Sequence, residues 1–133
     1  MGDCRFCDTA YQSTRNDLEN ELFFANYDNR PVSPGHMKLI PKRHVNSLCE
    51  LTEKELVALR NLMTEAKKVI DQRFHPDGYN MGINEGEAAG QTVFHLHVHL
   101  IPRYKGDVLD PTGGVRNVIP NKGNPRTYVL KTS

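Results

Sequence analysis

The sequence predicts a single α+β domain of 133 residues built on an antiparallel sheet. Three observations lead to this fold class. Strand-like segments come first, one long amphipathic helix follows them, and further strand-like segments come after the helix. The helix carries an N-terminal capping signature. From His95 to Leu100, histidines alternate with apolar residues, which is the period expected of a strand with two different faces.

Two strands are expected before the helix. The segment 21–27 is rich in apolar and aromatic residues and has the composition of a strand. The segment 28–35 contains two prolines and a glycine, which favour turns. A second strand over 36–41 follows. We therefore expect a hairpin with a long loop.

The long helix is expected to begin after Thr52. Glu55 follows three residues later, and this pair is the signature of a capping box. Apolar side chains then recur at spacings of three and four, and they are expected to form one buried face: Leu56, Leu59, Leu62, Met63, Ala66, Val69 and Ile70. The helix should end near Phe74, before the turn-forming segment 76–78.

Two more strands are expected after the helix. One covers 79–84, and a glycine-bearing loop over 85–92 separates it from the histidine strand, which Pro102 closes. The segment 105–126 contains glycines and prolines and shows little periodicity. We interpret residues 105–133 as an extended or flexible tail of the same domain, either a lid, a dimer arm or a disordered end.

The overall composition excludes several classes of protein. Apolar residues make up 38% of the chain and charged residues 25%, and no apolar run approaches the length of a membrane span. The chain begins without a hydrophobic signal segment, so we expect a cytoplasmic protein. A formal net charge of +1 gives no global field that would attract nucleic acid. Any binding of phosphate must come from local geometry.

The three alternating histidines are the strongest functional signal. In a regular strand, His95, His97 and His99 point to one face, and successive histidines are about 6.6 Å apart. The outer two are then roughly 13 Å apart, which strains a single metal site with bonds of about 2 Å. We therefore expect a division of labour, with one end of the row binding a metal and the rest acting on a substrate.

Two further patterns support this division. Cys4 and Cys7 have the Cys-x-x-Cys spacing of a zinc site, although a redox pair or reduced surface thiols have the same spacing. The remaining zinc ligands would come from His36, His44, His75, Cys49 and one member of the histidine row. The segment 90–92, Gly-Gln-Thr, offers backbone, amide and hydroxyl groups that suit phosphate oxygens.

The segment from Gln91 to Arg103 resembles the signature of the histidine triad (HIT) family, in which three histidines alternate with apolar residues after Gly-Gln-Ser/Thr. The resemblance extends over nearly the whole chain up to Arg103. It implies a HIT-like α+β fold, with an antiparallel sheet of about five strands, one long helix and a shorter N-terminal helix or loop. It also implies a homodimer.

The resemblance further implies a nucleotide hydrolase that acts at the α-phosphate of a purine nucleotide. His97 would be the nucleophile, and a nucleotidyl-histidine intermediate would form on it. His99, Gln91 and Thr92 would contact the α-phosphate, with His36 close by. Asp28 would hold the ribose hydroxyls and Asn84 would help to bind the nucleotide. A structural zinc ion would be held by four residues: Cys4, Cys7, His44 and His95. Cys49 and His75 are left without a role.

Several alternatives remain open at this stage. The segment 102–107 is closer to the branch of the family that hydrolyses dinucleoside polyphosphates, such as diadenosine tri- or tetraphosphate, than to the other branches. A hydrolase of nucleoside phosphoramidates or aminoacyl adenylates is the first alternative. A nucleotide-binding signalling module with negligible turnover is the second, and a histidine row that serves only a metal is the third. Arg116 or Lys122 in the tail would reach the polyphosphate.

Overall fold

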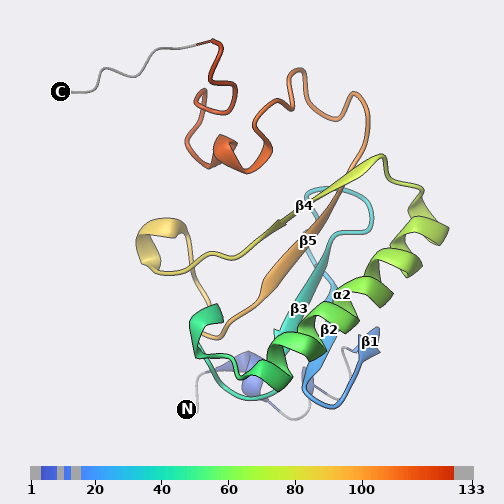
Figure 1. Ribbon diagram of the computed structural model, residues 1–133, viewed down its shortest axis with the longest axis vertical. Coiled ribbons are helices and arrows are strands. Elements are labelled where there is room, and N and C mark those ends of the chain that lie inside the picture. Colours follow the sequence, from blue (N-terminus) through green and yellow to red (C-terminus); the bar gives the residue numbers. More distant parts are fainter. Residues whose placement is uncertain (1–3, 9–10, 13–15, 128–133) are drawn as a thin grey trace.

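A single antiparallel sheet forms the centre of the molecule (Figure 1). The computed structural model describes residues 4–8, 11–12 and 16–127. Within these residues the sheet has five strands in the order β1-β2-β3-β5-β4, namely β1 (Leu18–Glu19), β2 (Phe23–Tyr27), β3 (Met37–Pro41), β4 (Gly78–Gly82) and β5 (Val98–Arg103). One long helix, α2 (Glu53–Phe74), and four short 3-10 helices complete the described structure: η1 (Arg5–Cys7), η2 (Leu48–Glu50), η3 (Glu87–Ala89) and η4 (Gly114–Val118). The predicted α+β class is confirmed.

The sheet brings together segments from both ends of the chain. The predicted hairpin is present, because β2 and β3 pair antiparallel with Asn26 opposite Lys38. β5 then pairs with β3 so that Lys38 lies opposite His99. The edge strand β4 pairs with the other side of β5. Asn26, Lys38 and His99 therefore form a row across three neighbouring strands on one face of the sheet.

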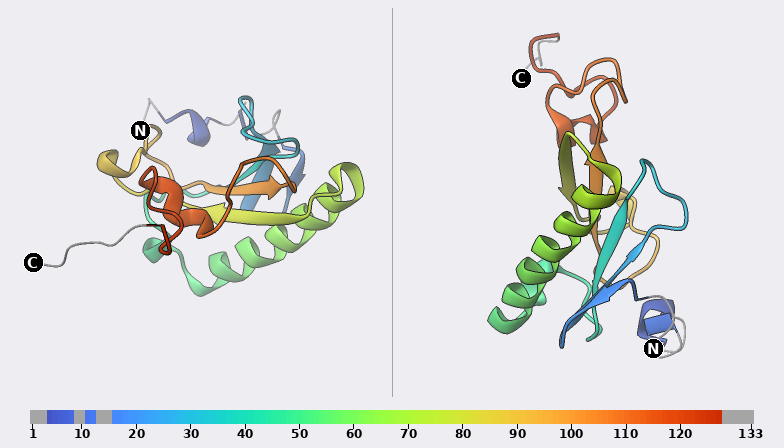
Figure 2. Two further views of the ribbon diagram at one scale, coloured as in Figure 1. Left: turned by 90° about the horizontal axis from the view of Figure 1, so that it is seen from above. Right: turned by 90° about the vertical axis from the view of Figure 1, so that its right-hand side faces the viewer.

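The two faces of the sheet are covered differently (Figure 2). α2 packs on one face, and the main core lies beneath it: Phe23, Ala25, Met37, Leu39, Val45, Leu51, Leu62, Ala66, Ile70, Leu96, Val98 and Leu100. η1 and the β2–β3 loop lie on the opposite face (Figure 2). Phe6 of η1 forms a second, smaller cluster there with Phe24 and Ile40. The strand alternation that buries apolar residues under α2 thus leaves polar residues facing η1.

The helix α2 begins where the sequence predicts. The Thr52 side chain accepts a hydrogen bond from the Glu55 N–H, and the Glu55 carboxylate accepts one from the Thr52 N–H, so the capping box is complete. His75 ends the helix in the left-handed conformation, with φ 51°. The prediction that Leu56 is buried was wrong: 43% of it is exposed, because the helix turns this position away from the sheet. None of the described helices is long and apolar enough to cross a membrane.

The histidine segment is less regular than predicted. β5 begins only at Val98, and residues 95–97 lie outside the strand, so the prediction of a regular strand from His95 was wrong. The pairing of β3 with β5 stops because the next backbone groups form hydrogen bonds with other partners. The Pro41 carbonyl accepts a hydrogen bond from the His95 ring, and the Leu96 N–H donates to the Val45 carbonyl. β4 is also shorter than predicted and ends at Gly82.

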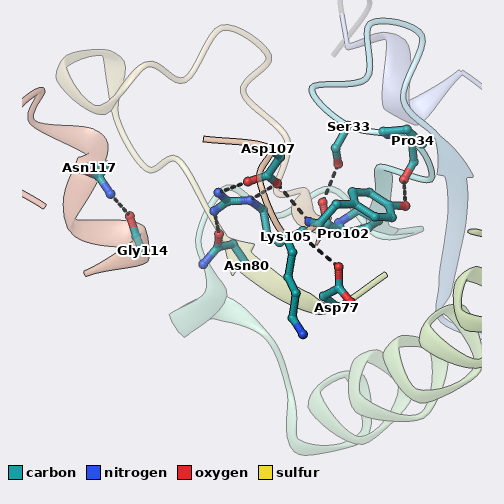
Figure 3. Close-up of polar contacts among 11 residues, drawn as sticks. Ser33, Pro34, Asp77, Asn80, Pro102, Lys105, Asp107, Gly114 and Asn117 are labelled. Atoms are coloured by element: carbon teal, nitrogen blue, oxygen red, sulfur yellow. Dashed lines mark hydrogen bonds and ion pairs between the residues drawn. The ribbon is translucent and has the colours of Figure 1, made fainter. Parts of the chain in front are cut away.

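The end of β5 is fastened to the β2–β3 loop (Figure 3). The Ser33 hydroxyl donates to the Pro102 carbonyl, and the Tyr104 hydroxyl donates to the Pro34 carbonyl, both at 2.6 Å. Arg103 pairs with Asp107 through two hydrogen bonds of 2.8 and 2.9 Å. The Ser33 and Tyr104 bonds hold the loop that leads into β3 against the strand that carries His99.

The segment after β5 folds back toward the edge of the sheet. η4 contacts β4. Within the segment, the Arg116 guanidinium donates to the Gly123 carbonyl at 2.9 Å, and the Asn117 amide donates to the Gly114 carbonyl at 3.1 Å (Figure 3). Gly113 has φ 88°, and a side chain there would collide with the Gly123 carbonyl. This turn therefore requires glycine.

Glu55 is expected to stabilise the fold through two sets of bonds. Its carboxylate caps α2 and also accepts hydrogen bonds of 2.7 and 3.0 Å from Arg43. Glu55→Ala should lower the free energy of unfolding by about 2 kcal/mol, because it removes a cap and the partner of a guanidinium. Urea unfolding measures this loss. Glu53→Ala, on the exposed first turn, is the control, and an equal loss in both variants would contradict the assignment.

Candidate functional site

Two clusters of polar side chains lie on the sheet face opposite α2. The first contains Cys4, Cys7, His44 and His95, and the second contains Asp28, His36 and His99. His97 joins them, since its ring centroid is 5.1 Å from that of His99, and the Phe6 ring contacts both His97 and His95. The three histidines of the row are therefore divided between different surroundings.

The first cluster has the donor set of a metal site. Its sulfur and nitrogen atoms all lie within 4.8 Å of one another. The Cys7 sulfur is 3.1 Å from the His44 Nδ1 and 3.3 Å from the His95 Nδ1, and the Cys4 sulfur is also 3.3 Å from the latter. Tetrahedral zinc with ordinary bond lengths places sulfur and nitrogen about 3.5 Å apart. These four residues could therefore hold a metal ion with little movement.

The orientation of His95 also fits a metal ligand. Its ring is fully buried, and its Nε2 lies 2.7 Å from the Pro41 carbonyl. A carbonyl oxygen only accepts, so Nε2 carries the proton and Nδ1 presents its lone pair to the two sulfurs. Burial lowers the pKa of His95, which keeps the ring neutral. A backbone carbonyl that fixes the tautomer in this way is common behind metal-binding histidines.

The same reasoning identifies the free nitrogen of His97. Its Nδ1 lies 2.9 Å from the His95 carbonyl and must therefore donate to it. The lone pair of the neutral ring is then on Nε2. Burial lowers the pKa of His97, so the neutral form dominates near neutral pH. The ring is thus oriented and deprotonated at one nitrogen, as a nucleophile or a base requires.

His36 and His99 form a directed pair. The Val32 N–H donates to the His36 Nδ1 at 3.2 Å, so neutral His36 carries its proton on Nε2. This nitrogen is 2.9 Å from the His99 Nδ1 and donates to it. His99 consequently carries its proton on Nε2 and can donate to an anion. Burial and the neighbouring rings lower the pKa of His99 to about 4, and burial also lowers that of His36.

The second cluster fits a hydrogen-bond relay better than a metal site, although its donor atoms are close enough for one. A metal bound to the His36 Nε2 would need the lone pair of that nitrogen. The proton would then move to Nδ1, where it would face the Val32 N–H. Two opposed N–H groups in a buried position are unfavourable. The relay also satisfies every nitrogen of His36.

Asp28 and Asn84 lie at the rim of this cluster. The Asp28 carboxylate accepts from the Arg30 N–H at 2.9 Å and lies 3.7 Å from the His36 Nε2. Burial opposes ionisation, but the Arg30 hydrogen bond and the electrostatic effects of His36, Lys38 and His99 together lower the pKa of Asp28. Asn84 lines a cavity of about 610 Å³ together with His36 and His99. This volume is sufficient for a small ligand.

The loop before the histidines places Gln91 and Thr92 differently. Gln91 is buried, its side-chain oxygen accepts from the Gly86 N–H, and its amide donates to Asn46 and to the Val93 carbonyl. Its side chain therefore holds the loop together and is not turned outward. Thr92 is exposed. Direct contact of Gln91 with a phosphate stays a prediction that requires some of these bonds to break.

Sequence reasoning missed two polar residues of this face. Lys38 and Asn26 are buried, with 5% and 1% of their surfaces exposed. The strand pattern could have found Lys38, because His36, Lys38 and Ile40 alternate onto the histidine face. Cys49 and His75 are exposed and outside both clusters. Cys49 and His75 are therefore excluded as candidate metal ligands.

Known proteins share this sequence pattern and this fold. The HIT domain family matches residues 13–106. The bis(5'-adenosyl)-triphosphatase of Dictyostelium discoideum is 38% identical over 108 residues, which are 81% of this chain and 72% of that protein. An asymmetrical bis(5'-nucleosyl)-tetraphosphatase of Schizosaccharomyces pombe is 40% identical over 101 residues, 76% of this chain, but the match spans only 56% of its own length.

Solved structures agree with these relatives. A HIT family protein from Bacillus anthracis superposes with a TM-score of 0.71 and 35% identity over 79% of this chain and 76% of that one. A zinc-bound histidine triad family protein from Mycobacterium smegmatis has a TM-score of 0.70 and 33% identity, covering 82% and 81%. Fold and sequence pattern therefore point to the same family.

The neutral His36–His99 pair predicts that the stability of the fold depends on pH. The pKa of His99 is about 4 in the folded protein, below its ordinary value of 6.5, so the unfolded chain binds more protons between these values. Stability should fall as the pH drops through this window. After allowance for partial exposure, the His99 share is about 1 kcal/mol between pH 7 and pH 5.

Urea unfolding of the wild type and of His99→Gln at both pH values measures this share. Glutamine keeps hydrogen-bonding groups but does not titrate, so the variant should lose less stability on acidification. Equal losses in the two proteins would show that the His99 ring is not held neutral by its surroundings.

Proposed function

The chain belongs to the HIT family, and from this membership we propose that it is a nucleotide hydrolase acting at the α-phosphate of dinucleoside polyphosphates, such as diadenosine tri- or tetraphosphate. The observation that carries the proposal is the orientation of His97. Its Nδ1–H is bound to the His95 carbonyl, which leaves Nε2 as a lone-pair donor beside a second histidine. The names of the relatives support this class of substrate.

The first step forms a bond between the His97 Nε2 and the α-phosphorus. The bond from phosphorus to the bridging oxygen breaks, and the rest of the substrate leaves as a phosphate anion. His97 then carries a positive charge, and the hydrogen bond from its Nδ1–H to the His95 carbonyl stabilises this charge. The Nε2–H of His99 donates to a phosphoryl oxygen, where negative charge develops in the transition state. His36 keeps His99 in the donating tautomer.

The second step hydrolyses the nucleotidyl-histidine. Water attacks the phosphorus, the bond to Nε2 breaks, and the nucleoside monophosphate leaves. Protons from the attacking water pass to solvent, and His97 returns to its neutral form. Histidine suits both steps because imidazole is a good nucleophile at neutral pH and also a good leaving group once it is bonded to phosphorus.

The rest of the predicted substrate contacts surround this pair. Asp28, held ionised, accepts hydrogen bonds from the ribose hydroxyls. Asn84 lines the cavity next to His36 and His99, and it contacts the nucleotide there. Thr92 donates its exposed hydroxyl to the α-phosphate. Gln91 acts in this proposal by shaping the loop that presents Thr92.

We also propose that Cys4, Cys7, His44 and His95 hold a structural zinc ion. Two thiolates and two imidazoles form a closed tetrahedral set that leaves no open position for water. Zinc then supplies stability and takes no part in the reaction. It holds η1, and therefore Phe6, against His97. The zinc-bound relative supports this choice of metal.

The alternative functions remain distinguishable. A hydrolase of adenosine phosphoramidate or of an aminoacyl adenylate would use the same nucleophile with another leaving group. A signalling module would bind nucleoside monophosphates but turn over nothing. The values of kcat/KM for a panel of these compounds and of diadenosine tri- and tetraphosphate would separate the three. The homodimer implied by the family also stays a prediction, which sedimentation equilibrium would test.

His97→Ala should lower kcat/KM for the preferred substrate by at least about 10⁴-fold, because it removes the nucleophile that forms the covalent intermediate. The circular dichroism spectrum should not change. Rapid acid-free quenching of the wild type should trap a nucleotide on His97 through an acid-labile bond to nitrogen. The control is His75→Asn, which changes a histidine outside the site and keeps the left-handed helix end. Substantial turnover by His97→Ala would overturn the mechanism.

Metal analysis tests the zinc site. Protein purified without chelators should contain about one zinc ion per chain, and Cys7→Ser should lose it and melt at a lower temperature. Cys49→Ser removes an exposed thiol outside the cluster and should keep the metal. His97→Ala should keep it as well. A metal-free wild type, or equal loss from both cysteine variants, would contradict the assignment.

A further inference from the structure

A row of polar side chains continues from the histidines across the sheet. His99 on β5, Lys38 on β3 and Asn26 on β2 are register neighbours on the same face. Neighbouring strands are about 4.8 Å apart, so Asn26 lies roughly 10 Å from His99. The mechanism proposed above uses His99 but neither of the other two residues. Their surroundings indicate a ligand.

Lys38 is an ammonium group in an unusual place. Only 5% of the residue is exposed, and its Nζ lies 5.2 Å above the centre of the Phe6 ring and 3.5 Å from the Tyr11 hydroxyl. No carboxylate of the described residues lies within ion-pair distance of it, and Asp28 acts on it only through a longer-range electrostatic interaction. A buried ammonium group with no carboxylate in contact is costly, and a ligand that brought acceptors to it would offset this cost.

Asn26 supplies a second, independent observation. Only 1% of the residue is exposed, and its Oδ1 has no hydrogen-bond partner within the described structure. Its Nδ2 donates weakly to the Tyr11 hydroxyl at 3.5 Å. A buried acceptor without a donor costs about 1–3 kcal/mol, so this oxygen also indicates a missing partner.

The pair does not suit a phosphate group. Phosphate oxygens near neutral pH are almost entirely acceptors, and the Asn26 Oδ1 would repel them. A planar base that carries acceptors next to a donor satisfies both residues. The position agrees, because Lys38 lies beside His99 on the neighbouring strand, and Lys38 and Asn26 lie two residues along the chain from His36 and Asp28. The Phe6 and Tyr11 rings supply aromatic surface beside the pair.

We propose that Lys38 and Asn26 select guanine as the base of the bound nucleotide. This inference rests on the proposed function, because it places the phosphate at His99. Along its edge, guanine presents N7 and O6 as adjacent acceptors, followed by the N1–H donor. The ammonium group of Lys38 serves both acceptors, and the Asn26 Oδ1 accepts from N1–H.

Adenine does not match this arrangement. Its edge runs from the N7 acceptor to the N6 amino donor and then to the N1 acceptor. No two acceptors are adjacent, so the ammonium group would face an amino group, and the Asn26 oxygen would face a lone pair. Each good base contact of this kind discriminates about tenfold or more against the wrong base.

Binding and kinetics test the selection on the full-length, metal-loaded protein. Titration calorimetry should give a dissociation constant for GMP at least about tenfold lower than for AMP. The ratio of kcat/KM for diguanosine over diadenosine tetraphosphate should show the same preference. Lys38→Leu, which keeps an apolar contact with Phe6, should bring both ratios close to one. Asn26→Leu should also reduce both preferences for guanine over adenine.

Lys67→Leu is the matched control. Its Nζ also lies 5.2 Å above an aromatic ring, that of Tyr79, but on the helix side of the sheet. Both ratios should equal those of the wild type. A general loss of packing would lower the affinity for both nucleotides alike, whereas loss of base selection changes their ratio. If Lys38→Leu does not fold, Lys38→Met serves the same purpose.

The outcomes separate this inference from the proposed function. Hydrolysis of neither dinucleotide, with GMP still bound more tightly than AMP, would refute the hydrolase and leave the base selection standing. Cleavage of both dinucleotides at equal kcat/KM would support the hydrolase and overturn the selection. A wild type that prefers adenine, or a preference for guanine that survives in Lys38→Leu, would also overturn it.

Discussion

The pairing of β3 with β5 is the constraint on which the polar face depends. These strands are distant in sequence, yet their register places Lys38 opposite His99 and Met37 opposite Leu100. Because side chains alternate, a slip of one residue would turn His99 into the core under α2 and bring a leucine to the polar face. The buried apolar residues on the other side of both strands make such a slip costly. Core packing therefore fixes the position of the polar side chains on the opposite face.

Backbone carbonyls then give each histidine of the row its own chemistry. The Pro41 carbonyl takes the Nε2 proton of His95, and the His95 carbonyl takes the Nδ1 proton of His97. His99 instead receives a proton from another histidine. Three identical side chains thus present a lone pair toward two sulfur atoms, a lone pair beside a second histidine, and an N–H donor. One acceptor, the His95 carbonyl, lies in the irregular backbone before Val98, and the other belongs to Pro41 at the end of β3. Both are available because the pairing of β3 with β5 does not extend to them.

The sequence was sufficient to predict the helix and strands and their order. It was insufficient to predict where the histidine strand ends and how Lys38 and Gln91 are placed. The capping box, the hairpin and the order of elements follow from local patterns, and the predicted metal ligands lie together as expected. The early end of the histidine strand could not be predicted, since it depends on a contact between His95 and Pro41, 54 residues away. Burial of Lys38 likewise depends on η1 folding over β3. The inward turn of Gln91 comes from partners in two other segments of the chain.

The contacts among Cys4, Cys7, His44 and His95 also bear on the order in which the molecule assembles. Cys4 leaves the ribosome before the other members of the cluster, and its partner His95 is 91 residues later in the chain. Closing so long a loop is entropically unfavourable until the intervening sheet has formed. The cluster therefore completes late during synthesis, and η1 covers the polar face only after the rest of that face exists. Until then Phe6 and the two thiols stay accessible to solvent, and the nascent chain depends on the sheet and α2 alone.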